Sequence, residues 1–269
     1  MITIIKRNGR TEPLDISKIQ KYTEAAVKGL TNVSQSELEV DAQILFRDGI
    51  TSQEIQKTLI KTAVDKIDID APNWTFVASR LFMFNLYHQV NSFTGYCTLE
   101  KYFTRGEKAG RLMLGLKEMY DLEKLDKHIK PERDMLFNYL GVKTLYDRYL
   151  IKDRDSNPIE LPQHMFMAIA MFLAQREEKR EEWAIKFYDM ISQFQVMLAT
   201  PTLSNARTTR HQLSSCYIGS TPDNIEGIFD SYQEMAMLSK FGGGIGWDWT
   251  GIRSMGSYID GHKNAAGGT

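Results

Sequence analysis

Hydrophobic and polar positions alternate over the first dozen residues, as they do in short β-strands. Apolar residues recur within residues 2–6, the chain turns at Asn8-Gly9, and an extended stretch resumes at Thr11. Asn-Gly between two such runs is a strong local signal for a hairpin, because both central residues of the favoured turn have positive φ. We therefore predict a β-hairpin at the start of the chain.

Four segments after the hairpin show the 3.6-residue period of amphipathic helices. Their predicted starts are Asp15 or Ser17, Ser34, Thr51 and Ala71-Pro72. Glu54 lies three residues after Thr51, which is the spacing of a capping box. In the second helix we expect Leu38 and the pair Ile44-Leu45 to point inward. Residues 1–92 are thus predicted to form one compact unit, a hairpin with four helices.

The rest of the chain changes character near residue 196. Residues 93–195 show helical patterns with charged connectors, and the apolar run at residues 165–174 predicts a buried helix. From residue 196 onward, short apolar runs alternate with glycines and polar loops, which is typical of the start of an α/β sheet. The predicted fold class is mainly α with α/β, in three segments: 1–92, 93–195 and 196–269.

Composition excludes several classes of protein. A net charge of −1 argues against a nucleic-acid-binding surface, and the longest apolar run is far below the roughly 20 residues that cross a bilayer. Cys97 and Cys216 are the only cysteines, too few for a disulfide framework. With no signal-peptide pattern at the start, we expect a cytoplasmic protein without nucleic-acid or membrane partners. The glycine-rich ending HKNAAGGT suggests a piece of a longer protein.

Charged residues around the hairpin form the first candidate site. Lys6-Arg7 precede the turn, Glu12 follows it, Lys18 lies in the next helical turn, and a capped helix begins at Thr51-Ser52. Cations and a helix N-terminus suit a nucleoside triphosphate, and a carboxylate can accept a ribose or base donor. The alternative is a solvated hairpin with surface ion pairs, since such charges are common there.

The pattern IIKRNGRTEPLDISKI resembles the start of an ATP-cone, and the four predicted helices match the layout of that module. In that family the cone is an allosteric sensor that binds ATP to activate or dATP to inhibit. The resemblance implies a pocket lined by Lys6, Arg7, Glu12, Pro13, Leu14, Asp15, Ile16, Ser17, Lys18, Ser52, Gln56, Phe84 and His88.

The second candidate site is the segment TPTLSNARTTRHQLSSC, residues 200–216. Cys216 stands beside small hydroxylic residues, whereas cysteines that serve only packing usually have aliphatic neighbours. The segment resembles the entry to the ten-stranded α/β barrel of the large subunit of class I ribonucleotide reductase. The likeness continues through Asp223, the glycine run at 242–246 and residues 251–257. That run lacks the GxGxxG context of a dinucleotide fold, so we reject a Rossmann site.

This resemblance implies specific roles. Cys216 is one of two redox cysteines that reduce the substrate's ribose, while its partner and the cysteine that carries the thiyl radical are expected beyond residue 269. Cys97 has no matching role, and we expect it to be a buried or idle thiol. Substrate-binding positions are Thr200, Ser215 and Gly244. The specificity site for a deoxynucleotide or ATP effector is Asp223, Asn224, Ile225 and Arg253, where a plain helix cap is the structural alternative for Asp223.

The resemblance to the reductase also implies a substrate, effectors and partner proteins. The substrate is a ribonucleoside diphosphate, the effectors are ATP, dATP and other deoxynucleoside triphosphates, and the large subunit is a homodimer. No histidine or cysteine cluster predicts a metal here, so the metal-radical cofactor belongs to a small beta subunit. Thioredoxin or glutaredoxin resets the disulfide.

Residues 1–269 alone are expected to be inactive. The alternative function is a nucleotide-sensing regulatory module without catalysis, although the zinc ribbon of cone-bearing regulators is absent from this sequence. The sequence downstream would distinguish the two interpretations, because the reductase needs further cysteines there.

Overall fold

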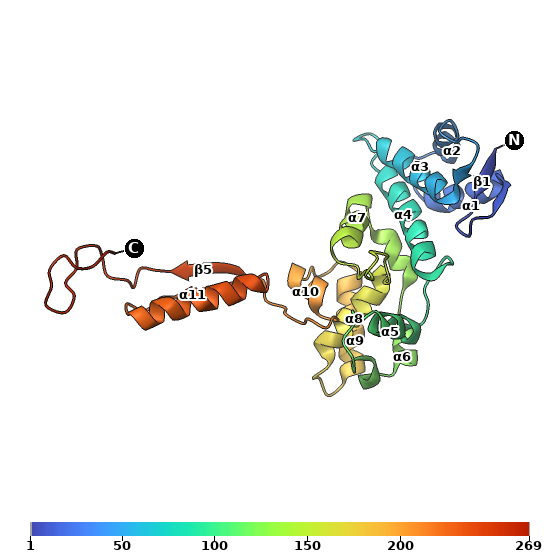
Figure 1. Ribbon diagram of the computed structural model, residues 1–269. Helices are drawn as coiled ribbons and strands as arrows, with labels where there is room; N and C mark the ends of the chain where they lie inside the picture. Colours follow the sequence, from blue (N-terminus) through green and yellow to red (C-terminus); the bar gives the residue numbers. More distant parts are fainter. Residues whose placement is uncertain (1, 269) are drawn as a thin grey trace. The chain divides into compact units, whose positions relative to one another are not determined.

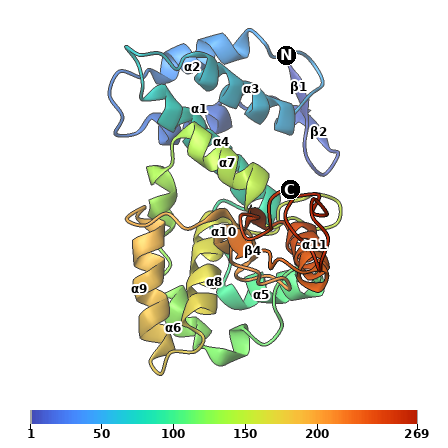
Figure 2. The same cartoon turned by 90° about the vertical axis from the view of Figure 1, so that its left-hand side faces the viewer.

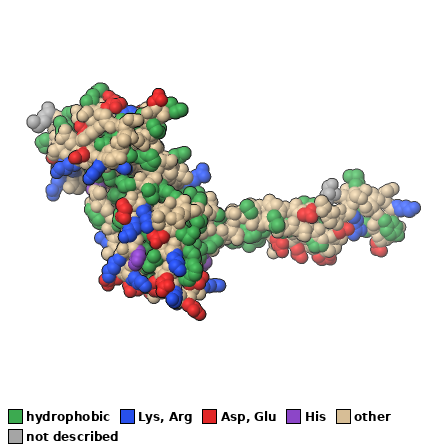
Figure 3. Space-filling view, turned by 180° about the vertical axis from the view of Figure 1, so that it is seen from behind, with side chains coloured by type: hydrophobic (Ala, Val, Ile, Leu, Met, Phe, Trp, Pro, Cys, Tyr) green, Lys and Arg blue, Asp and Glu red, His purple; other side chains and the backbone are tan. Residues whose placement is uncertain are grey.

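The computed structural model describes residues 2–268. By its internal contacts the chain falls into two compact units: one runs to Leu198 and includes Ala206–Arg210, and the other comprises Ala199–Asn205 and the chain from His211 onward. Each unit is described by itself. In the first, helices predominate, with one small sheet near the N-terminus (Figures 1 and 2). On the surface of the first unit in view in Figure 3, basic and acidic side chains are interspersed.

The predicted hairpin is present. Strands β1 (Thr3–Ile5) and β2 (Thr11–Pro13) pair antiparallel, and Gly9 occupies the turn between them with φ of 79°. Only glycine adopts that conformation without strain. A third strand, β3 (Ile50–Thr51), pairs parallel with β1 and gives the sheet order β2-β1-β3. β3 was not predicted because its two residues carry no periodic signal.

Four helices follow the strands as predicted. They are α1 (Ile16–Val27), α2 (Gln35–Gln43), α3 (Ser52–Asp65) and α4 (Trp74–Asn91). The capping box at α3 is confirmed: the Glu54 backbone amide donates to the Thr51 hydroxyl at 3.0 Å, and the Thr51 amide donates to the Glu54 carboxylate at 2.8 Å. Asp15 caps α1 by accepting from the amide of Ser17 at 3.0 Å.

The expectation for the end of the second helix was wrong. Ile44 and Leu45 are 76% and 58% exposed, because α2 ends at Gln43 and both residues lie in the turn that follows. Phe46, which is 9% exposed, points inward in their place and joins Leu38 in the core of the N-terminal segment. Hydrophobic periodicity does not show where a helix ends, so the two residues after the last turn of α2 were wrongly predicted to be buried.

Further helices make up the remainder of the first unit. They are α5 (Leu99–Lys108), α6 (Leu122–Asp126), α7 (Tyr139–Arg148), α8 (Pro162–Ala174) and α9 (Arg180–Ser192), with short 3-10 turns at Lys117–Met119 and Pro131–Leu136. The predicted buried helix is α8, which has buried side chains on nearly every turn and packs along α9. Among the described residues, no helix is long and apolar enough to cross a bilayer.

A carboxyl group lies at the centre of these helices. Asp134 is 1% exposed and accepts hydrogen bonds from Tyr87, Tyr96 and Gln163 at 2.6 to 2.8 Å. Burial raises the pKa of Asp134 to about 6, and the three donors only partly offset that effect. Since its partners come from α4, the loop before α5 and α8, this one side chain ties three segments together.

A buried ion pair joins distant parts of the same unit. Arg207 and Glu160 are both fully buried, and the guanidinium donates to the two carboxylate oxygens at 2.7 and 2.6 Å. Tyr102 donates a third hydrogen bond to Glu160 at 2.6 Å. Such bidentate geometry is the condition under which a buried pair offsets the cost of leaving water.

The second unit is built around a strand-helix-strand motif. Its elements are α10 (Thr200–Asn205), β4 (Cys216–Ser220), α11 (Ile225–Lys240) and β5 (Gly244–Asp248). β4 and β5 pair in parallel, with Cys216 opposite Gly244, and α11 is the connection between them (Figure 1). The α/β texture predicted from residue 196 is confirmed, while α10 was not predicted.

We predict that Glu160→Gln strongly destabilises the first unit. The substitution leaves the Arg207 guanidinium buried without its counter-charge, so the free energy of unfolding should fall by about 3–5 kcal/mol. Urea unfolding followed by circular dichroism measures the change. As a control, Glu182→Gln removes an exposed carboxylate 3.7 Å from Lys179 and should alter stability by less than about 0.5 kcal/mol. Equal effects of the two substitutions would contradict the prediction.

Candidate functional site

A cavity of about 760 Å³ opens beside the hairpin, and we call it the hairpin cavity. Its walls come from the hairpin turn, α1, the start of α3 and the end of α4. The residues that line it are Lys6, Arg7, Asn8, Lys18, Lys21, Tyr22, Ser52, Gln56, His88 and Ser92. The volume lies in the range of roughly 300–1,000 Å³ that small-molecule sites occupy.

The hairpin cavity is cationic. No acidic side chain contacts Arg7 in the described hydrogen bonds and ion pairs; its guanidinium donates to the amide oxygens of Gln56 at 2.7 Å and Asn85 at 2.8 Å. Amides fix the position of the guanidinium but leave its charge available to an anion. Lys6 and Lys18 share one carboxylate, Glu12, at 3.3 and 3.5 Å.

Helix α3 adds a further positive contribution. Its first residue, Ser52, lines the cavity, so the N-terminal end of the helix dipole lies at the wall. The hydrogen bond from Lys6 and the charges of Lys6 and Lys18 lower the pKa of Glu12, so it is ionised at neutral pH and partly compensates the two lysines.

Aromatic rings form the remaining wall. Tyr22 stacks on the His88 ring with centroids 6.2 Å apart, and its edge meets Phe84 at 5.4 Å. Burial lowers the pKa of His88, and the cations Arg7 and Lys6 lower it further. The imidazole is therefore neutral at physiological pH in the absence of an anion.

The structure brings together only part of the predicted cone site. Lys6, Arg7, Lys18, Ser52, Gln56 and His88 line the hairpin cavity, and Leu14 and Asp15 line a smaller adjoining cavity of about 110 Å³. The other predicted residues do not line either cavity. Glu12 forms ion pairs with Lys6 and Lys18, and the Phe84 ring packs against Tyr22. Ser17 donates a hydrogen bond to Asp15, Pro13 is the last residue of β2, and Ile16 is the first residue of α1. Of these, Ile16 is 47% exposed.

Four lining residues were missed by sequence reasoning: Asn8, Lys21, Tyr22 and Ser92. Lys21 and Tyr22 follow Lys18 by three and four residues, which is the spacing of one helical face. That spacing could have identified both residues once Lys18 was chosen. Asn8 and Ser92 carry no comparable signal, because their proximity depends on how the hairpin meets the end of α4.

The thiol of the second candidate site lies at the start of β4. Cys216 is exposed and stands opposite Gly244 in the parallel register. The Gly244 amide donates to the Ser215 carbonyl at 2.9 Å, and a Cβ added at Gly244 would lie 3.7 Å from the Cys216 sulfur. The glycine therefore leaves the space beside the sulfur open. Thr200 begins α10, whose last residue, Asn205, donates to the carbonyl of Gln212 at 2.9 Å.

The predicted specificity residues gather at the N-terminus of α11. Asp223 accepts from Arg253 at 2.7 Å, and this hydrogen bond lowers the pKa of the carboxyl. The alternative that Asp223 caps α11 is wrong. Asn224 is the cap and accepts from the amide of Gly227 at 2.8 Å, because α11 begins at Ile225 and Asp223 lies one residue before the cap position. Ile225, the first helical residue, is 63% exposed.

The other cysteine lies in a different setting. Cys97 is half-buried, and burial raises the pKa of its thiol, which disfavours the reactive thiolate. Its carbonyl contacts Nε2 of the buried His164 at 2.9 Å. Within residues 2–268, no group of three or more His, Cys, Asp or Glu side chains is arranged to hold a metal ion.

Three family models match the chain. They are the ATP cone domain at residues 2–89, the all-alpha domain of ribonucleotide reductase at residues 135–211, and the barrel domain of ribonucleotide reductase at residues 214–269. Over all 269 residues the chain is 70% identical to the ribonucleoside-diphosphate reductase subunit alpha of Helicobacter pylori. The chain belongs to the ribonucleotide reductase large-subunit family.

More distant reductase alpha subunits match over nearly the same span. The subunit of Treponema pallidum is 34% identical over 92% of this chain, and subunit alpha of reductase 1 of Escherichia coli is 33% identical over 97%. The chain spans about a third of the length of these relatives: 34% of the Helicobacter pylori subunit, 31% of the Treponema pallidum subunit and 35% of the Escherichia coli subunit.

We predict that Arg7→Gln raises the pKa of His88. The substitution removes a cation that disfavours the imidazolium, while the backbone of the cavity wall is unchanged. A pH titration of the His88 ring protons by NMR measures the shift. Arg10→Gln, which changes a cation on the same turn that does not line the cavity, is the matched control and should leave the His88 titration in place. A lowered or unchanged pKa of His88 in Arg7→Gln would show that the charge of Arg7 does not disfavour the imidazolium.

Proposed function

We propose that the chain is part of a class I ribonucleotide reductase large subunit that reduces ribonucleoside diphosphates to 2′-deoxyribonucleoside diphosphates under control by ATP and dATP. The single observation that carries the proposal is the exposed Cys216 thiol beside a glycine that leaves its sulfur uncovered. The reductase family of the chain supports the same conclusion.

Cys216 supplies electrons to the substrate. Loss of the ribose 2′-hydroxyl as water requires two electrons, and a pair of thiols provides them by forming a disulfide. The second thiol and the radical cysteine come from outside these residues. We assign substrate contacts to the hydroxyls of Thr200 and Ser215 and to the backbone at Gly244, where no side chain blocks approach.

The hairpin cavity is the proposed allosteric site. Its lysines and Arg7 pair with the triphosphate of ATP or dATP, the N-terminus of α3 adds partial positive charge, and Tyr22 with His88 offers a flat surface to the base. A bound polyanion also favours the protonated form of His88. The predicted residues around the cavity, from Glu12 to Ser17 and Phe84, hold these groups in position.

The N-terminus of α11 is the proposed specificity site for a deoxynucleotide or ATP. Asp223 and Arg253 neutralise each other, so an effector phosphate competes with the Asp223 carboxylate for the guanidinium. Asn224 and Ile225 complete the site. Phe229, Tyr232 and Met237 on α11 are 65%, 54% and 47% exposed, and we propose that a second large subunit covers them in a homodimer.

Other partners follow from the proposed reaction. A small beta subunit carries the metal-radical cofactor, which supplies the radical when the subunits assemble. Thioredoxin or glutaredoxin reduces the disulfide after each turnover, and the exposure of Cys216 suits exchange between thiols. We propose a cytoplasmic location, where these reductants are present.

ATP binding to the hairpin cavity is the first test. Isothermal titration of the chain with ATP should give a binding signal that Arg7→Ala weakens by roughly tenfold or more, because a charge-assisted contact to phosphate is lost. Arg10→Ala, on the same turn but outside the cavity lining, should bind as the unsubstituted chain does. Absence of heat with both ATP and dATP would refute the cone assignment.

Thiol chemistry is tested separately in the complete large subunit assayed with its small subunit. Cys216→Ser should abolish formation of deoxycytidine diphosphate, since serine cannot form a disulfide, while ATP binding persists. Cys97→Ser should retain activity because the Cys97 thiol is half-buried with a raised pKa. Full activity of Cys216→Ser would show that this thiol takes no part in the reduction, whereas ATP binding without any product from the unsubstituted subunit would favour a nucleotide-sensing module without catalysis.

A further inference from the structure

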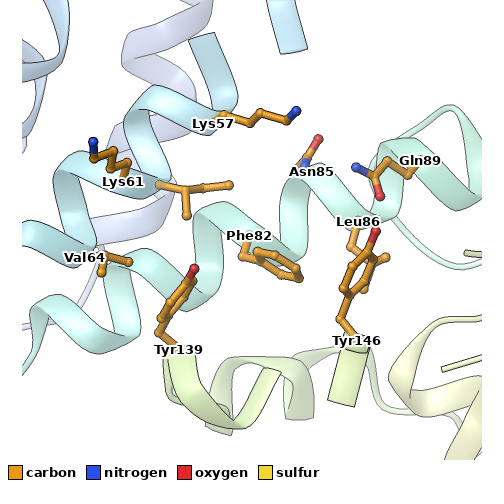
Figure 4. Close-up of a pocket in the computed structure, with 10 residues that line it drawn as sticks. Lys57, Lys61, Val64, Phe82, Asn85, Leu86, Gln89, Tyr139 and Tyr146 are labelled. Atoms are coloured by element: carbon orange, nitrogen blue, oxygen red, sulfur yellow. The ribbon is translucent and has the colours of Figure 1, made fainter. Parts of the chain in front are cut away.

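A second hollow lies between α3, α4 and α7, and none of its lining residues lines the hairpin cavity. We call it the α7 groove, and its volume is about 310 Å³. Figure 4 shows lysines along one side and aromatic rings along the other. Its lining residues are Lys57, Ile60, Lys61, Val64, Phe82, Asn85, Leu86, Gln89, Tyr139 and Tyr146.

The aromatic side of the α7 groove is held in place before any ligand arrives. Phe82 meets Tyr146 edge to face with ring centroids 5.3 Å apart, and it meets Tyr139 in the same way at 6.2 Å. The ammonium of Lys152 lies 4.3 Å from the centroid of the Tyr146 ring. Rings fixed by such contacts lose little conformational freedom when a flat ligand packs on them.

The opposite side of the groove is positively charged. Lys57 and Lys61 are exposed, lie one turn apart on α3, and form no ion pair with any residue that the structure describes. No aspartate or glutamate is among the described residues that line the groove. The carboxylate on α7, Asp147, is paired with Lys143 at 2.5 Å, and Glu54 on α3 interacts with Lys57 only through space. An anion in the groove thus meets two available cations.

The floor of the groove is apolar except at one end. Ile60, Val64 and Leu86 supply aliphatic surface, whereas Asn85 and Gln89 bring two amides side by side (Figure 4). An apolar pocket with a few convergent polar groups is the usual composition of a small-molecule site. The Asn85 amide oxygen already accepts from Arg7, and a fully apolar ligand would leave both lysines and the Gln89 amide unused.

We propose that the α7 groove binds a small planar aromatic anion, such as an aromatic phosphate or carboxylate. The ring of the ligand packs against Phe82, Tyr139 and Tyr146, and its anionic group pairs with Lys57 and Lys61. This site is separate from the hairpin cavity and goes beyond the proposed allosteric and catalytic functions.

The test uses 1-naphthyl phosphate as the probe, titrated by calorimetry into the intact chain with ATP already at saturation. Saturating ATP occupies the hairpin cavity and the proposed effector site at α11, and the part of the remaining heat that comes from the groove is identified by substitution of its lysines. Lys57→Gln combined with Lys61→Gln should weaken binding by roughly tenfold or more, since two charge-assisted contacts are lost. Lys124→Gln combined with Lys127→Gln, two lysines at α6 outside the groove, should leave the affinity unchanged.

Two further measurements locate the probe and its charge requirement. Nuclear Overhauser effects should connect the naphthyl protons with the Tyr146 and Phe82 rings, and uncharged 1-naphthalenemethanol should bind roughly tenfold more weakly or worse. The proposal is overturned if ATP displaces the probe, if the neutral analogue binds equally well, or if the α3 double variant binds as the unsubstituted chain does. It is also overturned if that variant changes only the association state of the chain, because the groove would then be a contact between copies.

Discussion

The hairpin cavity depends on holding four cationic side chains around one space against their mutual repulsion. Like charges that line one cavity repel each other, and solvent screens part of this repulsion because Lys18 is 62% exposed. The fold meets this cost in two ways. Glu12 lies between Lys6 and Lys18 and offsets both charges, whereas Arg7 is held by neutral amides and keeps its full charge. The strand register and the start of α3 keep these groups in place.

Local signals made much of the fold predictable. Asn8-Gly9 indicates the turn of the hairpin, and Thr51 with Glu54, three residues later, indicates the capped start of a helix. The apolar run in α8 predicts burial without any information about its neighbours. Features made by distant residues were not predictable in this way. β3 exists only because β1 lies beside it, and the partner of Arg207 is 47 residues away in the sequence.

The candidate sites show the same difference between local signals and contacts made by distant residues. The charge pattern and the resemblance to a cone predicted Lys6, Arg7 and Lys18 as site residues. Only the structure shows that the three side chains line one cavity. The amide oxygen that holds Arg7 belongs to Asn85, 78 residues away, so no local pattern could indicate that the charge is left available. Likewise, the ion pair of Asp223 depends on Arg253, which lies after β5 in the sequence.

Asp134 gives the molecule an unusual response to acid. Its pKa of about 6 in the folded chain lies above the ordinary aspartate value, so proton uptake by this one group favours the folded state as pH falls from about 6 toward 4. Glu12 and Asp48, which accepts from the amide of Thr3 on β1 at 2.8 Å, have lowered pKa values, and their contribution is lost only at lower pH, as each takes up its proton. Burial lowers the pKa of His164 to about 3, so its neutral imidazole makes the fold less stable as pH falls below the ordinary histidine value. His164 packs on Tyr96, which donates to Asp134. Two neighbouring buried groups therefore respond to mild acidification with opposite signs: proton uptake by Asp134 favours the folded chain, whereas proton uptake by His164 favours the unfolded chain.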